Sequence, residues 1–228
     1  MSRDEQGRPI RLITVSREFG AGGSELAREV GRLLDWPVLD HDIVHRVADR
    51  LRLDDGTVER FDEHPPSLLA RIASVLIVLT PEMYSFAAPI DVPSHDAIAA
   101  ATRHVIEDAA ASLPVIVVGH GAQCIFAGRP DALHVRLVAP PDVRVRRIAQ
   151  RMNTDPATVS AIVQRADHDR QAYVQRYFHS DVRGELLYDL RINTGRIAIG
   201  DAAAIVSRLV ESRPTGDDAD TLPGGHSS

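Results

Sequence analysis

A glycine-rich turn between an apolar strand and a helix is the feature that most restricts how this chain can fold. Residues 13–27 read ITVSREFGAGGSELA, in which a β-branched run leads into Gly20-Ala21-Gly22-Gly23 and a helix opens at Ser24. The backbone amides of such a turn, together with the positive end of the helix dipole, bind phosphate groups. The spacing therefore predicts a phosphate-binding loop made of Gly20, Ala21, Gly22, Gly23 and Ser24.

The loop lacks the lysine that usually accompanies this kind of turn. Compared with the pattern G-x-x-x-x-G-K-[ST], Gly22 takes the second glycine position, Ser24 takes the hydroxyl position, and Gly23 stands in place of the lysine. All 26 basic residues of the chain are arginines. Arg17 is the nearest substitute for the missing cation, because a guanidinium group can bind phosphate through two hydrogen bonds. Ser24 is the predicted ligand of a magnesium ion.

The order of the predicted elements indicates an α/β fold. Strands that alternate with helices favour a parallel core sheet covered by helices on both faces, with ligands bound beyond the carboxyl ends of the strands. We expect one domain over residues 10–212, a flexible stretch at 1–9 and a disordered tail at 213–228. The predicted strands are 11–16, 37–39, 114–118, 133–138 and 189–193, and the predicted helices are 24–35, 41–51, 67–79, 94–111, 140–152, 156–178 and 201–210.

Composition excludes several classes of function. The net charge of −6 argues against binding to a nucleic acid polymer, which usually requires a basic face. The single cysteine, Cys124, excludes an internal disulfide and suits a reducing cytoplasm. The longest apolar run falls far short of the roughly 20 residues that span a bilayer. We expect a soluble, cytoplasmic protein that binds a small phosphorylated ligand, and the sequence leaves its oligomeric state open.

Several stretches of the chain resemble the cytidylate kinase-like family, a branch of the P-loop nucleoside monophosphate kinases. They are ITVSREFGAGGSELAREVGRLL, VLDHDIVHRVA, VIVVGHGAQCIF, AYVQRYF and YDLRINTGRI, and the resemblance extends over about residues 10–211. It implies a P-loop kinase-like three-layer fold with a helical lid at about 153–183. It also implies ATP and Mg²⁺ as cofactors, and phosphoryl transfer to a nucleoside monophosphate or a related small acceptor.

The resemblance also implies roles for residues outside the glycine-rich loop. Asp40 and Arg46 match the segment that places the acceptor, and Arg46 would contact its phosphate. Arg170 and Arg176 match the lid best and would stabilise charge on the transferring group. His120, in the predicted acceptor site, and Gly121 stand where cytidylate kinases carry an arginine and an aspartate, so specificity for cytosine does not follow. The preceding strand also ends without a carboxylate for magnesium.

Two other functions are compatible with these residues. A catalytically degenerate nucleotide-binding module would explain the missing lysine and the missing carboxylate. A dinucleotide-dependent oxidoreductase would use Gly20 and Gly22 in a G-x-G-x-x-G motif, although Glu25 occupies the third glycine position and Asp40 would be the ribose-binding acid.

Two smaller patterns complete the sequence-based expectations. His41 and His45 imitate the spacing of a zinc-binding H-E-x-x-H motif, but no third ligand is evident and we predict no zinc site. The basic run formed by Arg144, Arg146, Arg147 and Arg151 is interpreted as a solvated helix face.

Overall fold

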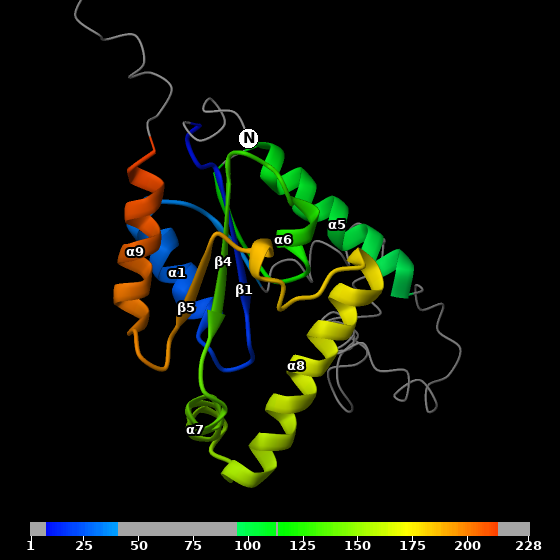
Figure 1. The fold of residues 1–228 in the computed structure, drawn as a ribbon, viewed down its shortest axis with the longest axis vertical. Coiled ribbons are helices and arrows are strands. Elements are labelled where there is room, and N and C mark those ends of the chain that lie inside the picture. Colours follow the sequence, from blue (N-terminus) through cyan, green and yellow to red (C-terminus); the bar gives the residue numbers. More distant parts are fainter. Residues whose placement is uncertain (1–7, 41–94, 113, 214–228) are drawn as a thin grey trace, which may run out of the picture.

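The protein is built around a five-stranded sheet in which every strand is parallel to its neighbours. A computed structural model describes residues 8–40, 95–112 and 114–213. The strand order is β2-β3-β1-β4-β5, and all carboxyl ends lie at one edge, at the bottom of Figure 1. The strands are β1 (Leu12–Arg17), β2 (Val38–Leu39), β3 (Val115–Val118), β4 (Ala132–Val138) and β5 (Leu190–Asn193).

Helices cover both faces of this sheet, so the predicted three-layer arrangement is confirmed (Figure 1). α1 and α9 lie on one face, and α5 and α6 lie on the other. α7 lies beyond the carboxyl end of β4 and leads into the long α8 (Figure 1). The helices are α1 (Gly23–Leu34), α5 (His95–Ser112), α6 (Ala122–Ile125), α7 (Pro141–Met152), α8 (Pro156–Phe178) and α9 (Ile199–Glu211), with a 3₁₀ turn at Glu185–Leu187.

Apolar side chains on the two faces of the sheet form two separate cores. Side chains alternate along a strand, so Ile13 and Val15 of β1 pack toward α1 and α9, whereas Leu12 packs toward α5. Leu26 of α1 and Val206 of α9 complete the first core and are fully buried. The continuous apolar runs in the sequence therefore mark strands that are buried on both sides.

Polar residues interrupt the second face near the carboxyl ends of β1 and β4. Thr14, Ser16, His134 and Arg136 are all buried there. In the β1–β4 register, Thr14 is paired with His134 and Ser16 with Arg136. Buried polar groups are costly unless they are hydrogen-bonded, and both pairs are: Thr14 Oγ1 lies 2.7 Å from His134 Nδ1, and Arg136 Nη1 lies 3.2 Å from Ser16 Oγ.

The predicted element boundaries agree with the structure to within two residues. The largest difference is at α9, which begins at Ile199 instead of residue 201. The predicted helices 41–51 and 67–79 lie outside the described residues. Among the helices that the structure does describe, none is long and apolar enough to cross a membrane.

Candidate functional site

The glycine-rich turn after β1 adopts a backbone shape that only glycine accommodates easily. Gly20 and Gly22 have φ angles of 82° and 89°, in the left-handed region. A Cβ atom on Gly22 would lie 2.6 Å from Cδ1 of Ile199, and one on Gly20 would lie 3.1 Å from the carbonyl oxygen of Arg144. Both conformation and close packing therefore require glycine at these two positions.

The turn delivers the first backbone amides of α1 to the carboxyl edge of the sheet. Gly22 is the N-cap of this helix and offers no side-chain cap, while Ser24 lies in the first turn and is partly buried. The first amides of a helix have no partner within the helix, and together with the dipole they favour an anion. The expected strand–turn–helix geometry is therefore present at residues 20–24, and phosphate binding by these amides stays a prediction.

Arg17 occupies the space that a side chain on Gly23 would need. A Cβ atom on Gly23 would lie 2.7 Å from Cγ of Arg17, and one on Gly119 would lie 2.0 Å from its Nη1. The side chain therefore runs from the start of α1 to the end of β3. Burial lowers the pKa of Arg17, and the nearby carboxylate of Asp40, which follows β2, acts in the opposite direction. Arg17, the predicted replacement for the lysine, thus lies directly beside the glycine-rich turn, and its contact with a phosphate stays a prediction.

Arg170 of α8 joins Arg17 at this edge. Its Nη1 lies 3.5 Å from the carbonyl oxygen of Arg17, and its guanidinium carbon lies 5.3 Å from the centroid of the Phe19 ring. Burial lowers the pKa of Arg170, and the charges of Arg17, Arg144 and Arg136 lower it further. The resulting pKa is about 9, with the charge of Asp167 acting in the opposite direction, so Arg170 stays charged near neutral pH and a bound phosphate would favour its charged form further.

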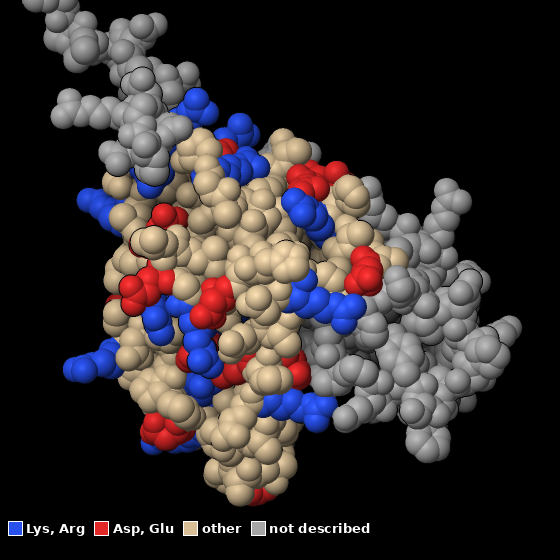
Figure 2. All heavy atoms as spheres, turned by 45° about the vertical axis from the view of Figure 1, so that its right-hand side comes forward, with Lys and Arg blue, Asp and Glu red and all other residues tan. Residues whose placement is uncertain are grey.

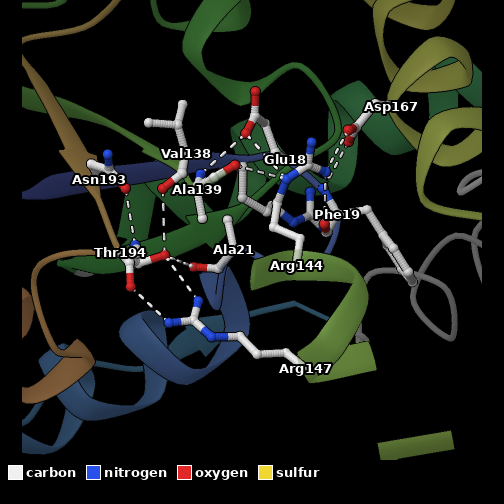
Figure 3. Close-up of polar contacts among 12 residues, drawn as sticks. Glu18, Phe19, Ala21, Val138, Ala139, Arg144, Arg147, Asp167, Asn193 and Thr194 are labelled. Atoms are coloured by element: carbon white, nitrogen blue, oxygen red, sulfur yellow. Dashed lines mark hydrogen bonds and ion pairs between the residues drawn. The ribbon is translucent and has the colours of Figure 1, made fainter. Parts of the chain in front are cut away.

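Arg144 is buried beneath the loop, so its interpretation as part of a solvated helix face is wrong. Figure 3 shows its guanidinium group between Glu18 and Asp167. Nη1 donates to Asp167 Oδ2 at 2.6 Å and to the carbonyl oxygen of Phe19 at 3.0 Å, and Nε lies 3.4 Å from Glu18 Oε2. Asp167 Oδ1 also accepts a hydrogen bond from the Phe19 amide at 2.7 Å. Arg144 therefore ties the loop to α7 and α8.

A second set of contacts holds the loop from the end of β5 (Figure 3). The Thr194 hydroxyl donates to the carbonyl oxygen of Ala21 at 2.8 Å, and Arg147 Nη2 donates to the carbonyl oxygen of Thr194 at 2.7 Å. Arg147 is therefore half-buried and hydrogen-bonded to the end of β5, whereas Arg146 and Arg151 are exposed as predicted.

The remaining predicted site residues do not all lie at the loop. His120 lies in the turn between β3 and α6 with a φ angle of 54°. Arg176 is exposed, and its Nη2 lies 3.3 Å from Asp96 Oδ1 at the start of α5. Its part in lid closure stays a prediction. Arg46 and the histidine pair at 41 and 45 lie outside the described residues.

Arg136 of β4 is a buried cation that the sequence analysis missed. Its Nη1 donates to Ser16 Oγ at 3.2 Å and to the Tyr188 hydroxyl at 3.3 Å. The only sequence signal is an arginine inside the apolar strand LHVRLV. Strand alternation would have placed it on the same face as His134.

The residues near the loop fit a magnesium ion only in combination with other oxygen ligands. Within the described ranges, no group of three histidine, cysteine or acidic residues is arranged to hold a metal. Mg²⁺ commonly binds to one or two protein oxygens together with phosphate and water. The hydroxyl of Ser24, at the start of α1, is compatible with that pattern.

Positive and negative side chains are mixed on the face drawn in Figure 2. On the described part of the face in Figure 2, arginines are interspersed with acidic residues over the whole surface. Recognition of a nucleic acid polymer usually uses a continuous basic stripe, and the arrangement on this face differs from it.

Sequence and structure comparisons relate this chain to known proteins. The family model of the cytidylate kinase-like family matches residues 12–196. A cytidylate kinase from Pyrobaculum aerophilum is 22% identical over 196 residues, which are 85% of this chain and 89% of that protein. An uncharacterized protein from Eubacterium ventriosum superposes with a TM-score of 0.62 at 18% identity, covering 89% of this chain and 99% of that one. A gluconokinase from Sinorhizobium meliloti gives 0.50 at 16% identity, covering 90% and 95%.

Proposed function

Because the chain belongs to the cytidylate kinase-like family, we propose that it transfers the γ-phosphoryl group of ATP to a nucleoside monophosphate or a related small acceptor in the cytoplasm. The observation that carries this proposal is the position of Arg17. Its stem packs on Gly23, where a lysine would otherwise begin, and its guanidinium group reaches Gly119. A cation is thus supplied to the loop without a lysine.

Each group at the edge has a distinct role in the proposed reaction. The amides of residues 20–24 would hold the donor phosphates, and Arg17 and Arg170 would neutralise the charge that spreads over the transferring group. Ser24 would hold Mg²⁺ together with phosphate oxygens and water. When bound, this ion supplies positive charge to the phosphate oxygens. The protein acts by positioning and electrostatics, without a covalent intermediate.

The acceptor would lie near the ends of β2 and β3. Asp40 follows β2, and His120 follows β3. Both strands lie on one side of β1 and β4 lies on the other, so Asp40 and His120 are at the carboxyl edge of the sheet on the side of Arg17 away from β4. Arg46 is proposed to contact the acceptor phosphate, and Arg176 to approach when α8 closes over the nucleotides. That approach would require Arg176 to leave Asp96.

A second candidate is a nucleotide-binding module of the same fold that has lost catalysis. It is favoured by the Gly119-His120-Gly121 turn, which leaves the end of β3 without a carboxylate, and by the absence of lysine. This candidate predicts nucleotide affinity without turnover.

A coupled assay with ATP, Mg²⁺ and a panel of nucleoside monophosphates separates the two candidates. Turnover of any acceptor that falls at least about tenfold in Arg17→Ala, and not in the exposed Arg146→Ala, supports the kinase. Binding of ATP by calorimetry with no turnover of any acceptor identifies the module. Folded protein that neither binds nor turns over nucleotide overturns both.

A further inference from the structure

Arg136 carries a buried charge that no acidic side chain of the described residues neutralises. The residue is only 5% exposed. Its Nη1 donates hydrogen bonds to two neutral hydroxyls, those of Ser16 and Tyr188, and its Nε is buried without a hydrogen-bond partner. Arginine stays protonated in proteins, and a buried charge without a partner is strongly unfavourable. The arrangement is incomplete unless an anion joins it.

The position of this guanidinium group links it to the phosphate loop. The β1–β4 register pairs Arg136 with Ser16, the residue directly before Arg17. Its charge also contributes to the lowered pKa of Arg170. Arg136 therefore belongs to the same group of cations as Arg17 and Arg170.

The acids around this group are already engaged with other arginines. Glu18 and Asp167 contact Arg144, and Asp40 acts on Arg17. The Tyr188 ring lies 5.4 Å from the guanidinium carbon of Arg136 and fixes its orientation, and the Tyr188 hydroxyl is itself bonded to the carbonyl oxygen of Val182 at 2.9 Å. A preorganised guanidinium with unused donors is suited to an oxyanion.

We propose that Arg136, oriented by Ser16 and Tyr188, is a phosphate-binding residue of this site and that its ligand is a phosphate oxyanion of the bound nucleotide. This inference rests on the proposed function for the identity of the nucleotide. Arg136 would extend the phosphate-binding surface from the loop after β1 to the end of β4.

The test compares full-length wild type with Arg136→Met, Arg136→Lys and the exposed control Arg146→Met. Calorimetry measures the dissociation constants for MgATP, for CMP and for pyrophosphate, and thermal unfolding measures the Tm of each ligand-free protein. In Arg136→Met we expect the affinity for at least one nucleotide to fall about tenfold or more, with the ligand-free Tm equal to or above that of wild type. Loss confined to MgATP identifies the donor phosphate, and loss confined to CMP identifies the acceptor phosphate.

Arg136→Lys keeps the charge but loses the planar fork, so its affinity should lie between those of wild type and Arg136→Met. If Arg136→Met does not fold, a severalfold loss in Arg136→Lys supports the inference and an unchanged affinity overturns it. Affinities of folded Arg136→Met within twofold of wild type for all three ligands also overturn it.

If wild type binds neither nucleotide, the proposed function fails. Pyrophosphate then tests Arg136 alone, because a tenfold loss supports the anion site and equal affinity overturns it.

Discussion

At the scale of single residues, the cation nearest the glycine-rich loop comes from a different element than the lysine of the G-x-x-x-x-G-K-[ST] pattern would. A lysine at position 23 would extend from the first turn of α1, whereas Arg17 extends from the end of β1 and covers Gly23. The two arrangements exclude each other, because both side chains need the same space. Gly23 is thus the residue that permits Arg17 to lie across the edge of the sheet.

Gly23→Ala tests this steric dependence. The new Cβ atom would lie 2.7 Å from Cγ and 3.0 Å from Cβ of Arg17, close to the backbone end of the side chain, so Arg17 must move. We expect the affinity for MgATP to fall about tenfold by calorimetry. Gly200→Ala is the matched control, since nothing lies within 4 Å of its Cβ position. It should keep the affinity and raise stability by about 0.5–1 kcal/mol. Wild-type affinity in Gly23→Ala would contradict a role for Arg17.

We expect His134 to make the stability of the protein depend on pH. Its Nδ1 lies 2.7 Å from Thr14 Oγ1, and burial lowers its pKa from the ordinary value of 6.5, with the charge of Asp189 acting in the opposite direction. Below pH 6.5 the unfolded chain therefore binds more protons than the folded protein, and the free energy of unfolding falls as the pH drops from about 6.5 toward the lowered pKa.

Urea unfolding of wild type and His134→Gln between pH 7 and pH 5 measures this contribution. The variant should lose less stability on acidification than wild type does over the same range. Parallel pH profiles for the two proteins would show that His134 does not contribute.

At the scale of elements, α7 and α8 pack against each other, and ion pairs of Arg144 with Glu18 and Asp167 connect them to the loop after β1. Ile148 and Val163 pack between the two helices together with Phe19 of the loop. Arg144 lies one turn before Ile148 on α7, so both face inward. The start of α8 is capped by Asp155, which accepts hydrogen bonds from the amides of Ala157 and Thr158.

Asp167→Ala should therefore loosen α8 and destabilise the fold. The change leaves buried Arg144 with one carboxylate fewer and removes the acceptor of the Phe19 amide. Because the Asp167 side chain is 26% exposed, we expect a loss of about 2–3 kcal/mol, below the range for fully buried pairs. Asp142→Ala breaks the exposed pair with Arg146 and should change the free energy of unfolding by less than about 0.5 kcal/mol. Equal effects of the two changes in urea unfolding would refute this account.

The arginines of α7 show what a local pattern can and cannot predict. The sequence correctly predicts that α7 runs from about residue 140 to 152, because Pro141 suits the first turn of a helix and apolar residues recur at helical spacing. It places four arginines on this helix without indicating which of them meet a carboxylate. The partners of Arg144 lie in the loop after β1 and on α8, and they are adjacent only in the folded chain. The spacing of Arg144 and Ile148 was the available signal.

At the scale of the whole molecule, the strand order determines which residues share the edge. Since β1 lies between β3 and β4, Arg17 of β1, Gly119 after β3 and Arg136 of β4 come together from distant parts of the sequence. Dinucleotide-binding folds have the order 3-2-1-4-5-6, which differs from the order found here. The oxidoreductase alternative is therefore not supported by the fold.

Thermal unfolding with different ligands tests the function of the whole fold. A ligand that binds only the folded state at a hundredfold excess over its dissociation constant adds about 2.7 kcal/mol, which corresponds to roughly 5–10 °C in Tm for a domain of this size. We expect MgATP to produce such a shift and NAD at the same concentration to produce none. A shift with NAD and none with MgATP would contradict the proposed kinase site.

The sequence by itself determined the strands, the helices and the glycine-rich loop, because apolar periodicity and the conformational freedom of glycine act over a few neighbouring residues. It also predicted Arg17 as the substitute cation, since the chain contains no lysine. Only the tertiary structure decided that Arg144 is buried, that Arg176 lies against Asp96 and that Arg136 has no acidic partner in the part of the chain that the structure describes. Burial and the pairing of charges depend on residues far apart in the chain, so the sheet order had to be known before these roles could be assigned.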